Sequence, residues 1–221
     1  MARQARVLRD QPGHPQALRQ HLIDATQRLL AAHGVTGLTT RTIAHEAQVA
    51  DGVLYNHFAG KDDLVVVAMV ERFTELGRQF SAGCPKPGAQ DLRTGLTVLV
   101  RQCRTFQADA FPMLAGLLGR PDLLHELFTR LHGAGGRTHP VVWSDIVDFV
   151  EAEQRLGTVS PDVSPDTIAT VMFGASQMDA LREPLTWGAT PTGTDAATAD
   201  GSSQESVERL VDVLVRACRA D

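Results

Sequence analysis

A short stretch of this chain, residues 39–61, carries side chains that can bind a phosphodiester or the edge of a nucleic-acid base. Arg41 and Lys61 supply positive charge, and residues 55–57 are a Tyr-Asn-His run of hydrogen-bonding groups. Arginine pairs with phosphates and guanine edges, and hydroxyl, amide and imidazole groups contact phosphate oxygens. This combination of residue types indicates recognition of nucleic acid.

The elements that must position these groups are two very short helices. Thr39 is typical of a helix N-cap, the helix it starts is about eight residues long and ends at residues 48–50, and a second helix of similar length begins at once. Helices this short must pack against the preceding one, and the pattern predicts a helix-turn-helix. The side chains expected to face its core are Ile43, Ala47, Val49, Leu54 and Phe58. The alternative to a helix-turn-helix is that these are two short helices that only pack within a helical bundle and bind nothing.

Charge is unevenly distributed along the chain. Residues 1–61 hold seven basic and four acidic side chains, a net charge of +3, so the remainder carries −8 because the total is −5. A basic head on an acidic body indicates that only the head contacts a polyanion such as DNA. Residues 1–17 are expected to be a flexible arm that either reaches into the minor groove through its arginines or is a disordered tail.

The same stretch resembles the tetracycline-repressor (TetR) family. That family's signature has a Gly at a helix end, Thr-x-x-x-Ile-Ala, a turn, Leu-Tyr-x-His-Phe and a Lys near the start of the fourth helix. Here these elements are Gly34, residues 39–44, residues 54–58 and Lys61. The resemblance covers roughly residues 18–70 and implies an all-α regulator of transcription that binds double-stranded DNA as a dimer.

Roles for the individual residues follow from their chemistry and from this resemblance. Thr40 and the free N–H groups at the helix start are expected to hold a phosphate, and Arg41 a phosphate or a guanine edge. Tyr55 and His57 would contact phosphates, and Lys61 would add a phosphate charge. The predicted DNA-binding set is Thr39, Thr40, Arg41, Asp51, Gly52, Val53, Tyr55, Asn56, His57 and Lys61.

Three positions depart from the family pattern. The turn usually carries Gly where this chain has Gln48, so a left-handed backbone there would be strained or differently arranged. Ala50 stands where Ser or Thr usually caps the recognition helix. Asp51 repels phosphates unless it accepts from a cytosine amino group, and it is otherwise a helix-start charge.

The rest of the sequence predicts further helices and a fold class of all-α. Apolar residues recur at three- and four-residue steps, and no alternating strand pattern is present. Ser164 before Pro165 and Ser202 in a Ser-x-x-Glu box predict two late helix starts, with a long loop over residues 183–201 between those helices. The expected domains are the arm, the helix-turn-helix over residues 18–61 and a helical body over residues 62–221.

The helical body is expected to bind a small molecule and to dimerise. Eight large apolar residues are either core residues or part of an apolar ligand cavity; they are Phe80, Phe106, Phe111, Met113, Trp143, Phe149, Met172 and Met178. Small residues on the helix after Ser164, together with the last apolar stripe, form either a dimer face or an ordinary intramolecular helix pair. The candidate dimer residues are Gly174, Ala175, Val207, Leu210, Val211 and Leu214.

Several classes of protein are disfavoured by what the sequence contains. Three widely spaced cysteines without a Cys-x-x-Cys motif argue against a disulfide framework or a zinc site and for a reducing cytoplasm. No apolar run reaches the roughly 18 residues of a membrane span. No apolar segment follows the N-terminal charges, so a secretory signal is not expected. His45-Glu46 lacks the second His of a metalloprotease helix, and Gly-x-Ser-x-Gly is absent. We expect neither a metal nor a cofactor, and no enzyme.

These observations lead to one main hypothesis and two alternatives. The main hypothesis is a ligand-responsive regulator, a repressor in most such proteins, that binds a palindromic operator as a homodimer and is released by a small, apolar molecule. The first alternative is a helical protein-interaction module with a vestigial DNA-binding head. The second is a small-molecule enzyme built in the helical body.

Overall fold

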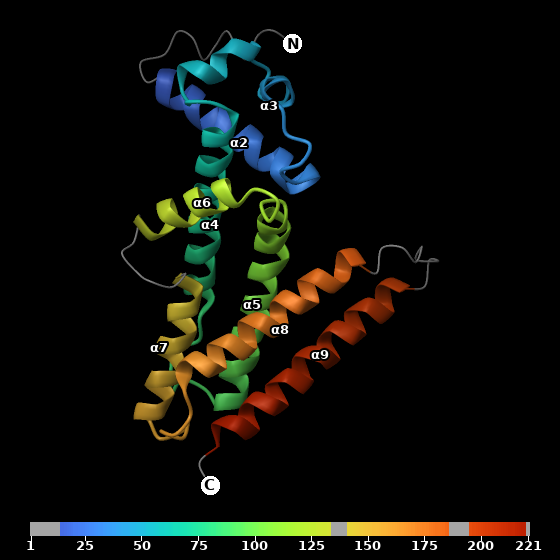
Figure 1. Ribbon diagram of the computed structural model, residues 1–221. Helices are drawn as coiled ribbons and strands as arrows, with labels where there is room; N and C mark the ends of the chain where they lie inside the picture. The colour runs from blue at the N-terminus through green and yellow to red at the C-terminus, as the bar shows by residue number, and fades with distance from the viewer. Residues whose placement is uncertain (1–13, 134–140, 186–194, 220–221) are drawn as a thin grey trace. The chain divides into compact units, whose positions relative to one another are not determined.

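The computed structural model describes residues 14–133, 141–185 and 195–219. All elements in these residues are helices, as the sequence predicts (Figure 1). The chain divides into two compact units. Unit 1 comprises residues 1–75 and 112–136, and unit 2 comprises residues 76–111 and 137–221. The predicted arm lies outside the described residues up to residue 13, and its last four residues belong to the first helix.

Unit 1 contains the predicted helix-turn-helix. Its elements are α2 (His14–His33), α3 (Thr40–Glu46), the 3₁₀-helix η2 (Asp51–Asn56), the first part of α4 (Lys61–Gly83), the end of α5 (Leu92–Ala115) and α6 (Pro121–Gly133). Helix α2 ends where Gly34 adopts a positive φ of 65°, which glycine adopts without steric cost. Leu22, Ile43, Leu54 and Leu64 are fully buried, so the two short elements and α4 share a core with α2.

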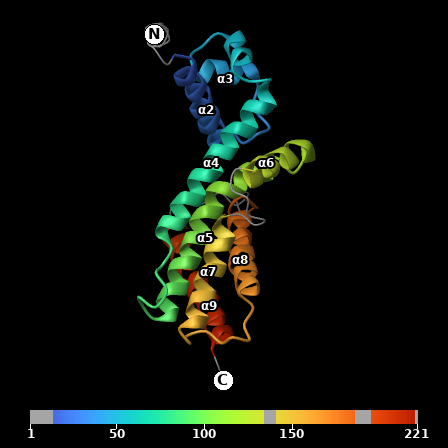
Figure 2. The same ribbon diagram turned by 90° about the vertical axis from the view of Figure 1, so that its left-hand side faces the viewer.

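Unit 2 contains the remainder of α4, most of α5, and helices α7 (Val141–Arg155), α8 (Pro165–Leu185) and α9 (Asp195–Cys218) (Figure 2). Helices α7 and α8 pack extensively on each other. Helix α9 runs antiparallel to α5, because Arg93 pairs with Asp212 at 2.6 Å and Arg101 donates to Gln204 at 3.1 Å. The core of unit 2 is lined by apolar residues from its helices, among them Leu96, Leu99, Ile146, Val150, Met172 and Val211.

The sequence predicted some helix boundaries well and others wrongly. Ser164 caps α8 as predicted, since its hydroxyl accepts from the Thr167 N–H at 3.3 Å. The predicted loop over residues 183–201 is wrong at both ends, because α8 runs to Leu185 and α9 begins at Asp195 rather than after Ser202. Alanines and polar residues within that segment can extend a helix that the capping box alone placed later.

Candidate nucleic-acid interface

The start of α3 is fixed by a reciprocal capping box. The Thr39 side chain accepts from the Thr42 N–H at 3.0 Å, and the Thr42 hydroxyl accepts from the Thr39 N–H at 2.9 Å. The prediction that Thr39 is an N-cap is confirmed. A box of this kind satisfies two backbone donors that would otherwise lack partners, so it holds Thr40 and Arg41 in the first turn of the helix.

The turn after α3 uses a left-handed residue where the family pattern has glycine. Gln48 has a φ of 53°, so a residue with a Cβ adopts a conformation that glycine adopts more readily. The preceding carbonyl is held from α2, because His21 Nε2 lies 2.9 Å from the Ala47 oxygen. The turn therefore keeps its geometry despite the strained residue.

The second element of the motif is the 3₁₀-helix η2 rather than the predicted α-helix of about eight residues. Ala50 at its N-cap position makes no side-chain hydrogen bond, and the helix spans only Asp51–Asn56. An uncapped start with Gly52 in the first turn disfavours a regular α-helix, and short runs commonly take the tighter form. Leu54 is fully buried and anchors the element to the core.

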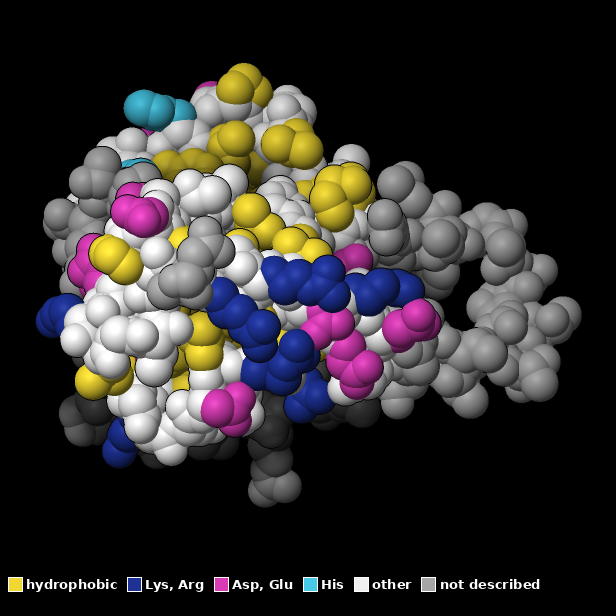
Figure 3. Space-filling model, turned by 90° about the horizontal axis from the view of Figure 1, so that it is seen from below, with side chains coloured by type: hydrophobic (Ala, Val, Ile, Leu, Met, Phe, Trp, Pro, Cys, Tyr) yellow, Lys and Arg dark blue, Asp and Glu magenta, His cyan; other side chains and the backbone are white. Residues whose placement is uncertain are grey.

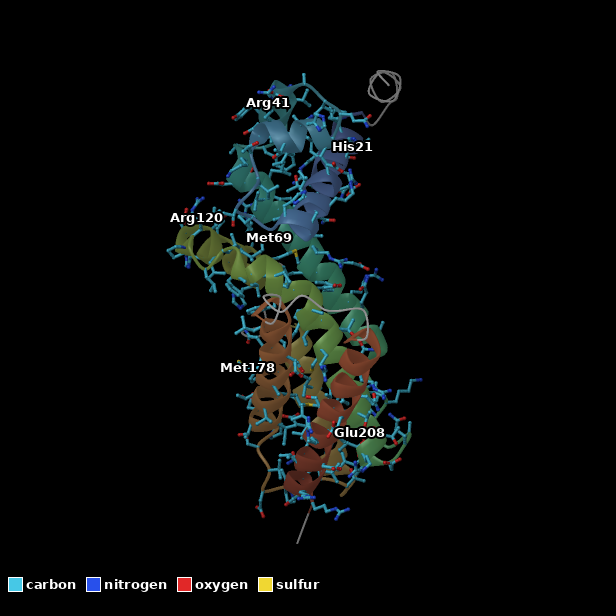
Figure 4. The ribbon with its side chains drawn as sticks, turned by 90° about the vertical axis from the view of Figure 1, so that its right-hand side faces the viewer. His21, Arg41, Met69, Arg120, Met178 and Glu208 are labelled. Atoms are coloured by element: carbon cyan, nitrogen blue, oxygen red, sulfur yellow. The ribbon has the colours of Figure 1, made fainter. Side chains whose placement is uncertain are left out.

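Most of the predicted DNA-binding side chains lie on the surface of unit 1. Arg41, Asp51, Gly52, Tyr55 and Asn56 are exposed, and Tyr55 has an exposed fraction of 61%. Figure 4 shows Arg41 on the outer side of α3. Thr40, Val53 and His57 are half-buried, while Thr39 is exposed with its hydroxyl used in the cap.

Of the residues predicted to face the core, Ile43, Ala47, Leu54 and Phe58 are buried, and Val49 is half-buried.

An open hollow of about 380 Å³ adjoins this surface at α3. Arg41 and Thr42 contribute to its lining, together with His33 and His45, which the sequence did not single out. Arg28 of α2 pairs with Glu46 of α3 at 2.8 Å. Arg41 is therefore the arginine of α3 that lines this hollow, and it lies there with the His33 and His45 side chains.

Lys61 is held by its own chain rather than projecting freely. Its Nζ donates to the Leu38 carbonyl oxygen at 3.2 Å and lies 3.6 Å from Asp62 Oδ1. The side chain therefore connects the start of α4 to the segment just before α3. Its ammonium group contributes charge near the interface from a fixed position.

Two arginines that the sequence did not indicate, Arg120 just before α6 and Arg130 within it, bind the start of α4 in unit 1. Arg120 donates to Asp62 at 2.9 Å and to Asp122, and these hydrogen bonds, first with Asp122 and then with Asp62, raise the pKa of Arg120. Arg130 donates to Asp63 at 2.9 Å. Both aspartates next to Lys61 are thus paired with a cation.

Residues 22–68 match the family model described as bacterial regulatory proteins, tetR family. The matched segment comprises the two short elements, the core of α2 and the first turns of α4, which are the elements whose geometry is given above. Within residues 22–68 the chain is thus similar to the regulators of the tetR family.

Curated relatives match part of the chain. One segment is 34% identical over 82 residues to the HTH-type transcriptional regulator BetI of Brucella suis, and it covers 37% of this chain and 41% of that relative. The transcriptional repressor KstR of Rhodococcus jostii is 31% identical over 102 residues, 46% of each chain. The chain thus matches less than half the length of these relatives. They are regulators, which agrees with the expectation that the chain is not an enzyme.

Solved structures of low identity share the fold over nearly the whole chain. A TetR-family transcriptional regulator from a Rhodococcus species has a TM-score of 0.64 and 20% identity, covering 90% of this chain and 99% of that one. FadR of Bacillus subtilis, solved in complex with stearoyl-CoA, has a TM-score of 0.54 and 14% identity, covering 89% and 95%. These similarities establish the fold alone.

Four aromatic rings of unit 2 form a continuous series. Phe80 and Phe106 have ring centroids 6.4 Å apart, Phe106 and Phe173 6.0 Å, and Phe173 and Trp143 6.3 Å. Phe173 was not among the predicted ligand residues. Such edge-to-face and tilted contacts are favourable arrangements for aromatic rings.

The other predicted ligand residues are placed differently. Phe149 and Met172 are buried in unit 2, and the Phe149 ring lies against Gly95 of α5. Phe111 is half-buried, whereas Met113 is buried but belongs to unit 1. Met178 is 52% exposed on the outer side of α8 (Figure 4). The eight residues therefore do not form one group.

The predicted dimer residues fall on two sides of their helices. On α8, Gly174 and Ala175 are half-buried between the exposed Val171 and Met178. On α9, Leu210 is half-buried, and the exposed Val213 lies three residues further on. Three candidates instead face the chain's own core, because they are buried within the single chain; they are Val207, Val211 and Leu214.

The three cysteines are free and poorly ionised. Burial raises the pKa of Cys84 to about 12, with a further contribution from Asp145, and burial also raises the pKa of Cys103 to about 12. Cys218 is buried and its pKa is raised for the same reason.

In the part of the chain that the structure describes, no three His, Cys, Asp or Glu side chains gather as a metal site would require. No described helix is long and apolar enough to span a membrane.

Proposed function

We propose that the chain regulates transcription by binding operator DNA as a homodimer and by releasing it when a small, largely apolar molecule binds in unit 2. The observation that carries the proposal is the outer surface of unit 1. There Arg41, Tyr55 and Asn56 are exposed on elements whose opposite sides are fully buried. A helix-turn-helix presents such side chains to the major groove, where arginine contacts phosphates or guanine edges.

The supporting residues act by holding this surface in place. Lys61 fixes the segment before α3, and Arg120 and Arg130 neutralise Asp62 and Asp63. Without that pairing, the aspartates would repel the phosphates near Lys61. Asp51 is the one acidic side chain in the predicted DNA-binding set. By contrast, Figure 3 shows a face on which basic side chains are interspersed with acidic ones, unlike the uniformly basic surface that DNA favours.

The first experiment measures binding of the full chain to the DNA upstream of its own gene, against a scrambled duplex at near-physiological salt. We expect specific binding about a thousandfold or more tighter than to the scrambled duplex. Arg41→Ala should abolish the preference. Arg155→Ala removes the same charge from an exposed position of α7 and serves as the matched control.

Each outcome of this experiment has a clear meaning. Equal, steeply salt-dependent binding to both duplexes would reduce the head to an electrostatic contact. Absence of binding in a ligand-free preparation would favour the alternative of a helical interaction module whose DNA-binding head is vestigial.

For the dimer interface we propose the outward sides of α8 and α9. Val171, Gly174, Ala175 and Met178 follow the i, i+3, i+4, i+7 spacing of one helical face, and small residues at its centre allow close approach of another helix. Val213 of α9 adds an apolar side chain with 58% exposure. Two copies of these faces could form a four-helix bundle, which places two heads on neighbouring half-sites.

Light scattering on the full chain tests this interface. Met178→Glu and Val213→Glu should shift the mass from dimer to monomer, because each buries a carboxylate at the apolar contact. The control is Leu118→Glu, which places the same charge at an exposed position of unit 1. A dimer that survives both substitutions would place the contact elsewhere.

We propose that the effector binds among the aromatic rings of unit 2. FadR of Bacillus subtilis holds stearoyl-CoA, a ligand with a long apolar chain, and the ring series of Phe80, Phe106, Phe173 and Trp143 could pack against an apolar effector here. A ligand that favours one separation of the heads shifts the population away from the DNA-competent state, so the DNA and ligand affinities are coupled reciprocally.

A further inference from the structure

Among the described residues of unit 2, four polar side chains are buried, and one of them has no hydrogen-bond partner among these residues. Glu153 accepts from the Gly88 N–H at 2.8 Å, the Ser160 hydroxyl accepts from the Asp162 N–H at 3.4 Å, and the Ser176 hydroxyl donates to the Met172 carbonyl at 2.8 Å. Gln107 of α5 is only 2% exposed, yet its carboxamide has no hydrogen-bond partner among the residues that the structure describes. Buried polar groups are almost always paired, since leaving one unpaired is costly.

Two contacts between α5 and α8 locate this carboxamide. Arg104 pairs with Asp179 at 3.4 Å, and the Phe106 and Phe173 rings meet at 6.0 Å. Gln107 follows both α5 residues within one turn, so it lies close to the place where α5 and α8 meet. On α8, positions 173, 176 and 179 are three residues apart and share a helix face.

The Ser176 hydroxyl therefore lies on the side of α8 that faces α5, between the two contacts. It is 1% exposed, and its single proton is used in the bond to Met172. Its oxygen keeps lone pairs that can accept a hydrogen bond. Gln107 and Ser176 thus offer buried donor and acceptor groups near the Phe106 and Phe173 rings, beside the ion pair of Arg104 and Asp179.

We infer that Gln107, assisted by Ser176, recognises the polar group of the effector; this inference rests on the proposed function. The ligand it fits has an apolar body that packs near the Phe106 and Phe173 rings, and a neutral group that both donates and accepts, such as a hydroxyl or a carboxamide. A neutral carboxamide satisfies such a group without placing a charge in the core.

The charges around the site disfavour an anionic ligand. Arg104, one turn before Gln107, is paired with Asp179. Asp166 accepts from the Trp143 Nε1–H at 3.1 Å, and Asp145 accepts from Ser81, so carboxylates already adjoin the aromatic series. A buried ligand carboxylate would meet this negative charge without a cation of its own.

The test uses four ligands with the same apolar body and different end groups: octane, 1-octanol, octanamide and octanoate. Their affinities for the full-length chain are obtained by thermal stabilisation at a series of ligand concentrations, in the absence of DNA. We expect 1-octanol and octanamide to bind about tenfold more tightly than octane, as one net hydrogen bond provides. Octanoate should bind more weakly than octanamide.

Gln107→Met keeps the length of the side chain and removes its hydrogen bonds, so the preference for the alcohol and the amide over octane should vanish while octane still binds. Gln177→Met makes the same change at an exposed position of α8 and should leave the preference intact. A preference that survives in Gln107→Met would overturn the inference and assign the carboxamide to a buried water. So would tightest binding of octanoate, or a wild-type chain that none of the four ligands stabilises.

Operator binding by the same variants separates this inference from the proposed function. Gln107→Met leaves unit 1 unchanged and should still bind the operator, whereas failure of the wild-type chain to bind would refute the proposed function whatever the ligand preferences are.

Discussion

The two units secure their polar groups in different ways. In unit 1, three side chains hold backbone carbonyls of other elements: His21 contacts Ala47, Gln27 donates to Ala68 at 3.0 Å and Lys61 donates to Leu38. In unit 2, Glu153 and Gln154 also bind backbone groups, but the side-chain contacts of α8 and α9 with α5, such as the ion pairs of Arg93 and Arg104, join partly exposed groups. The buried Gln107 has no hydrogen-bond partner among the described residues.

This difference corresponds to two kinds of binding surface. The DNA-binding surface must have its geometry before DNA arrives, and bonds to the backbone provide that rigidity. A unit that responds to a ligand instead benefits from a group whose partner comes with the ligand, because binding then changes the stability of the unit. The following predictions test the contrast, beginning with the largest effect.

The largest effect is expected in the core that the short elements of unit 1 share. Leu54→Ala should lower the free energy of unfolding by about 2–5 kcal/mol, because Leu54 is fully buried and its truncation leaves a cavity. Chemical denaturation measures this change. Leu118→Ala, at a position that is 69% exposed in the same unit, should change it by less than about 0.5 kcal/mol. Equal effects would mean that η2 is not anchored as described.

One substitution made in both units should have opposite effects. Gln27→Met removes the hydrogen bond to the Ala68 carbonyl and should destabilise the chain by about 1–2 kcal/mol. Gln107→Met removes an unpaired buried carboxamide and should stabilise the ligand-free chain by about 1 kcal/mol. Denaturant melts of the two variants under identical conditions measure both signs. Destabilisation of similar size in both would contradict the contrast between the units.

Relief of strain in the turn of unit 1 should have a smaller effect. Gln48→Gly is expected to stabilise the chain by about 0.5–1 kcal/mol. Glycine adopts the φ of 53° without strain, and this gain is only partly offset by the conformational entropy that glycine adds to the unfolded chain. Thermal unfolding reports the change. The matched control is Gln177→Gly in the exposed side of α8, where glycine should destabilise by a similar amount. A loss of stability in Gln48→Gly would show that the Gln48 side chain contributes more than the strain costs.

The smallest effect concerns the ion pair between Arg130 and Asp63 in unit 1. Its groups are partly exposed, so a double-mutant cycle of Arg130→Ala and Asp63→Ala should give a coupling energy of about 0.2–1 kcal/mol. The coupling should shrink when the salt concentration is raised from 0.1 to about 1 M. A coupling that does not respond to salt would assign the contact to packing rather than to charge.

The sequence was informative where the signal is local. Thr39 as a cap, Gly34 as a helix end and the buried side of the motif all follow from spacing within a few residues, and the structure confirms them. The 3₁₀ form of η2 and the early start of α9 were not predicted. In both places weak helix propensities decide the type or the start of the helix, and the spacing of apolar residues carries no information about these propensities.

Contacts between distant segments carried no sequence signal. Nothing in the spacing of Arg120 and Arg130 indicates that they pair with aspartates nearly 60 residues or more away. Gln107 likewise stands in an apolar stripe of α5 as one polar residue, and only its burial without a partner makes it conspicuous. The exposed residues of the candidate DNA surface were predictable because their chemistry and their resemblance to a known pattern coincide.

The ionisation of the native thiols has a practical consequence for spectroscopy. Burial keeps Cys84 and Cys103 protonated far above neutral pH, with pKa values of about 12, and Cys218 is fully buried. Maleimide reagents attack the thiolate, so at pH 7 they should spare these three residues. A cysteine introduced at the exposed Tyr55 would then be the reactive position of each copy. In the proposed homodimer, a fluorophore or spin label there would report the separation of the two heads in an otherwise unmodified chain.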